Sequence, residues 1–309
     1  MLIRNPPVEL DEGLWMLGTN EYPLYLARGE SECTIFEGGT GAMGPVLDRQ
    51  LAELDVGPET VKQVVVTHAH PDHVMAVPSF RKAFPGISVL ASAVAAKTLS
   101  MDKAIAFFCK VDVALTGALL KAGSIGQRDR PAAFEGTQIA VDRVLKDGDA
   151  IAVAGGEYRV METPGHSEGS LSFHRPDRGV LICSDATGYY LPEHGCWWPN
   201  YFTGYGAYVD SMRRLALLDA EILCLSHNAA IRGAEDVKAY FSGAISATEE
   251  YHQRIVEEAR AGKDPRGIAE QLGSEVYEKT QLLGVEFFQR NCGLLVKQSL
   301  RHEGIGQDA

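Results

Sequence analysis

Three histidines and one aspartate lie within six consecutive positions of this sequence, in the segment Thr67-His68-Ala69-His70-Pro71-Asp72-His73. The apolar run Val64-Val65-Val66 precedes this segment and predicts a strand that delivers it to the edge of a sheet. His68 and His70 can project to the same side of an extended chain, and Pro71 biases the backbone away from helical angles. The four side chains divide into two pairs, so the spacing favours a two-metal site over a hydrated polar turn.

The pattern His68-x-His70-x-Asp72-His73 resembles the signature of the metallo-β-lactamase superfamily, whose members are mostly hydrolytic metalloproteins. Three later segments, within a resemblance that spans residues 10–235, are similar to those that carry the remaining superfamily ligands. They are Thr163–Ser167, Cys183–Ala186 and Leu225–His227. The resemblance implies one ion bound by His68, His70 and His166, a second bound by Asp72, His73 and His227, and Asp185 as a bridge between them.

The order of apolar runs predicts a chain built in two similar halves, each with strands followed by a helix. Short strands are expected at 14–17, 22–27, 33–36 and 64–67 in the first half, then a second set at 144–153, 158–163, 171–174 and 180–183, with 221–225 as the last strand. This order agrees with the αβ/βα sandwich that the resemblance implies, in which metals bind in a cleft at one edge of two sheets.

Two helical segments are expected in addition to the sandwich. An alanine- and leucine-rich stretch predicts a helical insertion at about 92–130, and the chain beyond Gly233 reads as helical to its end. We therefore divide the chain into a metallo-β-lactamase-like domain at 1–232 and a helical C-terminal extension at 233–309, packed on the cleft. The apolar face of the extension should bury itself against the insertion, or else form the seam of a homodimer.

The composition of the 309 residues limits the classes of partner. The formal net charge of −12 argues against a nucleic-acid partner, and the absence of a long apolar run argues against a membrane partner. Six cysteines without C-x-x-C spacing, and an N-terminus without a signal-peptide core, predict a reducing cytoplasm. A small-molecule acyl substrate is the expected partner.

An aromatic-rich segment at 189–198 follows Asp185 and is either a packed excursion or part of a substrate pocket. In the pocket interpretation Tyr189 offers a hydroxyl to a developing oxyanion. The other predicted substrate-binding residues are Tyr190, His194 and Trp197 from this segment, Phe107 from the insertion, and Phe287 and Phe288 from the extension. We expect His174, His252 and His302 to be surface residues.

These features together predict a hydrolase with two divalent ions, of which zinc, iron and manganese all suit the ligands. A hydroxide shared by the ions would attack the carbonyl of a thioester or lactone, and Asp72 would orient it or return a proton to the leaving group. The chain loosely resembles PqsE-like thioesterases and acyl-homoserine lactone lactonases, whereas no substrate-binding tail like that of glyoxalase II is recognisable. The alternatives are an iron-dependent redox enzyme similar to persulfide dioxygenases, and a regulatory partner-binding protein with residual hydrolysis.

Overall fold

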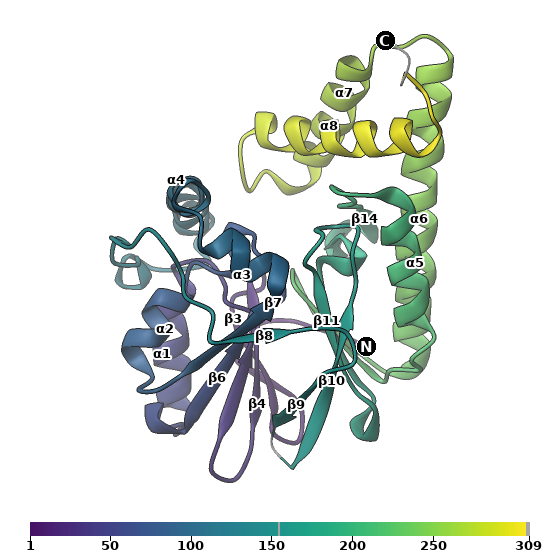
Figure 1. Cartoon of the computed structure of the whole chain (residues 1–309). Coiled ribbons are helices and arrows are strands. Elements are labelled where there is room, and N and C mark those ends of the chain that lie inside the picture. The colour runs from purple at the N-terminus through teal and green to yellow at the C-terminus, as the bar shows by residue number, and fades with distance from the viewer. Residues whose placement is uncertain (154, 307–309) are drawn as a thin grey trace.

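Two seven-stranded sheets stacked face to face form the centre of the molecule, and helices cover the outer face of each sheet (Figure 1). The structure is a computed structural model and describes residues 1–153 and 155–306. This helix–sheet–sheet–helix layering, with further helices at the C-terminus, confirms the predicted αβ/βα sandwich.

The first sheet is formed mainly by the N-terminal half of the chain. Its strands, in spatial order, are β2 (Val8–Asp11), β3 (Leu14–Gly18), β4 (Pro23–Arg28), β5 (Cys33–Phe36), β6 (Val61–Val65), β7 (Ser88–Ser92) and β8 (Arg143–Leu145). The strands from β2 to β5 are antiparallel, and those from β5 to β8 are parallel. The helices of this half are α1 (Met43–Glu53), α2 (Val77–Ala83), α3 (Ala93–Leu99) and α4 (Asp102–Ala122).

The second sheet combines the later strands with the N-terminal strand. Its order is β1 (Leu2–Ile3), β16 (Ala230–Arg232), β15 (Ile222–Leu225), β12 (Val180–Ser184), β11 (Leu171–Arg175), β10 (Gly156–Glu162) and β9 (Ala150–Val153). A separate hairpin joins β13 (Tyr189–Leu191) to β14 (Cys196–Trp198). The helices of this half are α5 (Tyr205–Ala216), α6 (Ala234–Arg260), α7 (Pro265–Thr280) and α8 (Val285–His302). Six 3-10 helices complete the described chain: η1 (Pro58–Thr60), η2 (Pro71–His73), η3 (Gln127–Asp129), η4 (Pro176–Arg178), η5 (Asp185–Thr187) and η6 (Pro192–His194).

Alternation along the central strands explains how the layers are held together. Neighbouring residues of a strand point to opposite faces, so a buried strand must present apolar side chains on both. Val65 packs in the layer between the two sheets, whereas its neighbour Val64 packs with the helices of the first half. In the second half, Ile182 packs between the two sheets and Leu181 packs with the helices. The run of β-branched residues before His68 is therefore a strand buried on both faces, as predicted.

The structure corrects the predicted strands in two places. Gly148, with φ +82°, reverses the chain between β8 and β9, so residues 144–153 contribute to both sheets and not to one. Glycine adopts this backbone conformation without a steric penalty. Residues 221–225 are not the last strand, because β16 follows and pairs with both β15 and β1.

The C-terminal helices pack mainly on their own half of the molecule and not on the 92–130 insertion as expected. Ile255, Leu272 and Leu295 of α6, α7 and α8 are fully buried in the cluster that covers the second sheet. The loop between α7 and α8 extends toward the first half, where Leu282 and Leu283 pack against its cluster; Leu283 contacts both clusters (Figure 1). This loop therefore packs against both halves of the molecule.

All six cysteines are free thiols. None of the helices described here is long and apolar enough to cross a membrane.

Candidate metal centre

The seven predicted metal ligands come together at one edge of the two sheets, just after the C-terminal ends of strands. Parallel and mixed sheets commonly present their chemistry at this edge, because the loops there converge. The ligands His68, His70, Asp72 and His73 follow β6, His166 follows β10, Asp185 follows β12 and His227 follows β15.

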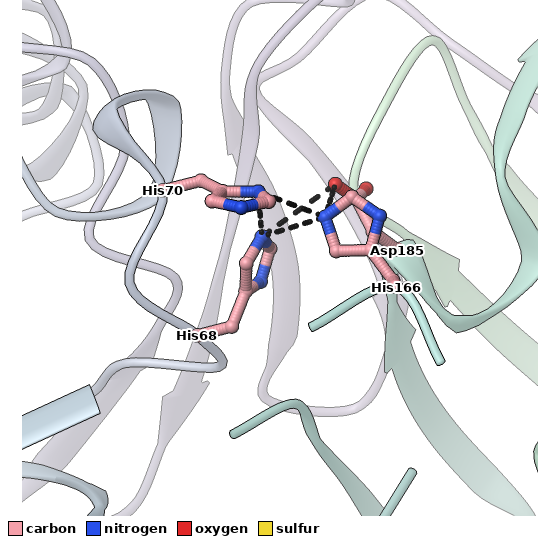
Figure 2. A group of neighbouring side chains, drawn as sticks. All are labelled: His68, His70, His166 and Asp185. Carbon is pink, nitrogen blue, oxygen red and sulfur yellow. Dashed lines mark hydrogen bonds and ion pairs between the residues drawn. The ribbon is translucent and has the colours of Figure 1, made fainter. Parts of the chain in front are cut away.

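The first group of ligands contains His68, His70, His166 and Asp185, whose side chains point toward one another (Figure 2). Nε2 of His166 lies 3.1 Å from Nε2 of His68 and 2.9 Å from Nδ1 of His70. Nε2 of His68 and Nδ1 of His70 are 3.1 Å apart. Three imidazole nitrogens and a carboxylate oxygen thus lie within 4.8 Å of one another, close enough to hold one ion. The ion that the resemblance implies here stays a prediction.

The second group contains Asp72, His73 and His227. Oδ2 of Asp72 lies 3.4 Å from Nε2 of His73 and 3.8 Å from Nε2 of His227. The short helix η2 places Asp72 and His73 on this side, while His70 in front of Pro71 remains extended and belongs to the first group. The division of the motif into two pairs that the spacing predicted therefore follows from the turn at Pro71.

Asp185 lies between the two groups. Its Oδ2 is 3.2 Å from Nε2 of His166 and 3.4 Å from Nε2 of His73, and its Oδ1 is 3.2 Å from Nε2 of His227. One carboxylate thus faces ligands of both groups, which is the position that a bridging ligand occupies.

The residues present fit divalent metal ions. His73 Nε2 and Asp185 Oδ1 are buried and have no hydrogen-bond partner in the described part of the chain. Such groups are costly to bury unless something satisfies them. Both atoms face the ligand cluster, and imidazole nitrogen with carboxylate oxygen is a donor set that zinc, iron and manganese all accept.

The imidazole rings are held in orientation by their second nitrogens. Nδ1–H of His166 donates to the carbonyl of Asn200 at 2.9 Å, and Nδ1–H of His227 donates to the carbonyl of Glu21 at 2.8 Å. A hydrogen bond of this kind fixes the tautomer and leaves Nε2 free to bind an ion.

Glu37 is a buried carboxylate in this supporting layer that the sequence interpretation missed. It accepts from Nδ1–H of His73 at 2.8 Å and from the Thr67 hydroxyl at 2.9 Å, and Thr67 in turn lies 3.1 Å from Nδ1 of His68. The available signal was its position directly after the buried strand Cys33–Phe36 and before Gly38. An acidic residue there needs a buried partner.

The electrostatics differ between the two groups. Burial and the neighbouring His166 lower the pKa of His70 to about 3, so this ring is neutral and able to bind an ion at neutral pH. Burial would also lower the pKa of His73, but the carboxylates of Asp72 and Glu37 outweigh it and raise that pKa well above its usual value. The second group must therefore release protons to bind a cation.

Aromatic side chains flank the ligand cluster. The Tyr189 ring lies 4.7 Å from the His227 ring, and Tyr22 meets the same ring edge-on at 5.5 Å. Phe202 lies 5.1 Å from His166 and 6.4 Å from His70. Of these three aromatic residues only Tyr189 was predicted at the site; Tyr22 and Phe202 come from loops that carried no motif.

The remaining predicted residues of the aromatic segment make other contacts. The rings of Tyr190 and Trp197 lie 4.8 Å apart and are tilted by 35°, and both pack against Tyr240 of α6. His194 is exposed, with Nε2 3.3 Å from the carbonyl of Lys279 on α7. These residues attach the hairpin to the C-terminal helices, and their role in substrate binding stays a prediction.

The predicted phenylalanines differ in burial. Phe107 on α4 and Phe287 on α8 are 55% and 40% exposed, whereas Phe288 is buried against Trp198, with the ring centroids 5.3 Å apart. Their contact with substrate likewise stays a prediction. His174 and His252 are more buried than expected: His174 lies in the second sheet, and His252 stacks on Tyr205 at 3.7 Å.

Known proteins with sequences similar to this chain include enzymes. A hydroxyacylglutathione hydrolase of Aeromonas salmonicida (strain A449) is 29% identical over 206 residues, which cover 66% of this chain and 59% of that protein. One of Cereibacter sphaeroides (strain ATCC 17029 / ATH 2.4.9) is 27% identical over 176 residues, which cover 56% of this chain and 51% of that protein. The chain thus spans between half and three fifths of these curated relatives. They belong to the glyoxalase II class. This chain was expected to differ from that class, because no substrate-binding tail like that of glyoxalase II is recognisable in its sequence.

Solved structures share the fold. A metallo-beta-lactamase family protein from Thermus thermophilus has a TM-score of 0.65 at 24% identity, covering 96% of this chain and 95% of that chain. An archaeal metallo-beta-lactamase superfamily protein from Sulfolobus tokodaii has a TM-score of 0.55 at 18% identity, covering 74% and 85%. Residues 23–227 match the family described as the metallo-beta-lactamase superfamily. The chain with its histidine and aspartate cluster therefore belongs to the metallo-beta-lactamase superfamily.

Proposed function

We propose that this chain is a hydrolase that uses two divalent metal ions to cleave the thioester of a small acyl group. The observation that carries the proposal is the position of Asp185, whose two oxygens face ligands of both groups. When bound, the ions would supply the Lewis acidity that polarises a carbonyl and lowers the pKa of water. One ion would be held by His68, His70 and His166. The other ion would be held by Asp72, His73 and His227, and Asp185 would bind both ions.

Two further side chains would act on the reacting groups. Asp72 is the more exposed of the two carboxylates in the cluster. Burial would raise its pKa, but the neighbouring His73 holds that pKa below its usual value, so the carboxylate is ionised at neutral pH. It can therefore orient a water, accept a proton from it and pass that proton to the leaving group. Burial raises the pKa of Tyr189, so its hydroxyl stays protonated and can donate to a developing oxyanion.

A thioester is preferred over a lactone because the similar curated proteins are named hydroxyacylglutathione hydrolases. Both substrates present an activated carbonyl, so the same side chains would serve either reaction. Phe202 beside His166 and Tyr22 beside His227 would leave a narrow apolar approach to the ions, which suits a small acyl group.

The test is elemental analysis of the purified chain, followed by assays on a lactoylglutathione thioester, an acyl-CoA, an acyl-homoserine lactone and glutathione persulfide. We expect two ions per chain and a higher kcat/KM for the thioesters than for the lactone. A single bound ion at saturating metal, with oxygen consumed in the presence of persulfide, would contradict the proposal and favour the iron-dependent redox alternative.

A further inference from the structure

A cavity of about 310 Å³ lies between α2, α4 and residues 130–134, and none of the seven candidate metal ligands lines it. Helix α4 lines it with Cys109, Asp112 and Thr116, which fall on one face of the helix because they are three or four positions apart. Helix α2 contributes Lys82. Neither the metal site nor the proposed hydrolysis uses these residues.

Two polar groups are buried at the inner end of this cavity. Asp112 is 7% exposed, and its Oδ1 accepts the N–H of Gly41 at 2.7 Å. Thr116 is 3% exposed, and its hydroxyl has no hydrogen-bond partner within residues 1–153 and 155–306. A buried hydroxyl without a partner is unfavourable, and one that lines an open cavity can be satisfied by a ligand that enters it.

The outer end of the cavity has the opposite charge. Lys82 and Arg130 are exposed and line the cavity beside the apolar side chains of Met75 and Phe134. The cavity therefore combines a buried anion and hydroxyl, apolar side chains and two exposed cations. A complementary molecule would carry a cation, an apolar body and an anion.

We propose that this cavity binds a small zwitterion that carries an ammonium group at one end, a carboxylate at the other, and a short hydrocarbon or aromatic body between them. The ammonium would donate to Asp112 and Thr116, and the carboxylate would face Lys82 and Arg130. Burial raises the pKa of Asp112 to about 6, which leaves the carboxylate ionised at neutral pH. The body would pack on Met75 and Phe134.

The cavity adjoins the loops behind the metal site. Met75 donates its N–H to the carbonyl of Gly39 at 2.9 Å, and Gly38 donates its N–H to the carbonyl of His73 at 3.0 Å. A ligand against Met75 would thus touch the chain two residues from a metal ligand. Binding itself needs no hydrolysis, so it can be tested whether or not the proposed function is correct.

The first test is calorimetry on the metal-loaded chain with 4-(aminomethyl)benzoate, which has both charges, and with benzylamine and 4-methylbenzoate, which have one each. We expect the zwitterion to bind at least about tenfold more tightly than either single-charge probe. Asp112→Asn should remove this preference, because the amide oxygen can still accept the N–H of Gly41 while the negative charge is lost.

Two controls locate the binding. Asp210→Asn, on the exposed side of α5, should leave the affinity unchanged. A probe held by its carboxylate on the metal ions would bind no more tightly than 4-methylbenzoate, which carries the same carboxylate. Equal affinities for the three probes, or an affinity for the zwitterion that Asp112→Asn does not lower, would overturn the proposal.

The second test uses the two half-buried thiols, Cys109 inside the cavity and Cys196 on the β14 strand. The zwitterion should slow alkylation of Cys109 by iodoacetamide severalfold and leave Cys196 unaffected, as measured by mass spectrometry of peptides. Protection of both thiols, or of neither at a saturating probe concentration, would contradict binding at this place.

Discussion

The imidazole of His73 donates its Nδ1–H to the buried carboxylate of Glu37 at 2.8 Å, while Nε2 of the same ring faces the metal cluster. The same carboxylate also accepts from Thr67, whose hydroxyl lies beside Nδ1 of His68. Glu37 thereby orients one ligand of each group. A residue outside the recognised motif thus supports both halves of the metal centre.

Replacement of Glu37 by glutamine should weaken binding of the second ion by about 10- to 100-fold, because the charged partner of His73 is lost. The affinity can be measured by competition with a chromophoric chelator. Glu30→Gln, at an exposed position, is the matched control and should bind both ions normally. Unchanged affinity in Glu37→Gln would show that the buried carboxylate has no role in orienting His73.

Asp185→Asn should weaken the binding of both ions and lower kcat/KM for hydrolysis by at least about 100-fold, since one carboxylate faces both ligand groups. Metal content after gel filtration and kcat/KM are the two measurements. Asp210→Asn makes the same chemical change on the exposed side of α5 and should retain the metal content and the kcat/KM of the wild type. If Asp185→Asn loses only one ion, its carboxylate does not bridge.

Tyr189→Phe should lower kcat by about 10- to 1000-fold without a change in metal content, because only the hydroxyl that would donate to the oxyanion is removed. Tyr190→Phe provides a control from the adjacent position, since that ring packs on Trp197 and Tyr240 and not on His227. Similar losses in the two variants would mean that the hairpin was disturbed, and that Tyr189 is not a catalytic residue.

Asp112 should make stability depend on pH. Its pKa is raised by burial, from 3.8 to about 6, so its favourable contribution is present below pH 3.8 and is lost as the pH rises through 6. The unfolding free energy of Asp112→Asn relative to the wild type should therefore rise by about 3 kcal/mol between pH 3.5 and pH 8. Denaturant unfolding of both proteins with saturating metal at each pH measures the difference. A difference independent of pH would show that Asp112 has an ordinary pKa.

Leu283→Ala should increase the relative kcat/KM for longer acyl groups by about 2- to 10-fold, if the α7–α8 loop limits the approach to the ions. The ratio of kcat/KM for a short and a long acyl thioester is the measurement. Leu217→Ala, at a side chain that is 80% exposed, is the control and should keep the wild-type ratio. An unchanged ratio in Leu283→Ala would place the loop outside the substrate path.

The first four ligands could be predicted from the sequence because the information is local, whereas His166, Asp185 and His227 were implied by the resemblance to the superfamily. A buried strand followed by His68, His70 and the Pro71 turn specifies where the side chains point over a few residues. Glu37 and Phe202 could not be found in this way, since they reach the site through the pairing of β5 with β6 and through the loop before α5. Such contacts depend on tertiary packing and not on spacing.

The sandwich was also predictable, but its edges were not. Hydrophobic periodicity identifies strands without saying which sheet they join, and so β8 and β9 were assigned to one set. The amphipathic C-terminal helices were expected against the insertion, yet α6 and α8 pack against α5. Amphipathicity requires a buried face and does not identify its partner.

The metal ligands follow strands of both sheets, with His68, His70, Asp72 and His73 after a strand of the first and His166, Asp185 and His227 after strands of the second. Each bound ion would therefore join two layers that are otherwise held together by apolar packing and by hydrogen bonds such as that from the Tyr25 hydroxyl to the carbonyl of Leu225. By mass action, ligand at 100 times its dissociation constant adds about 2.7 kcal/mol to the unfolding free energy. The melting temperature of this chain should consequently follow the free metal concentration around it, and chelation should unfold it at temperatures that the loaded protein tolerates.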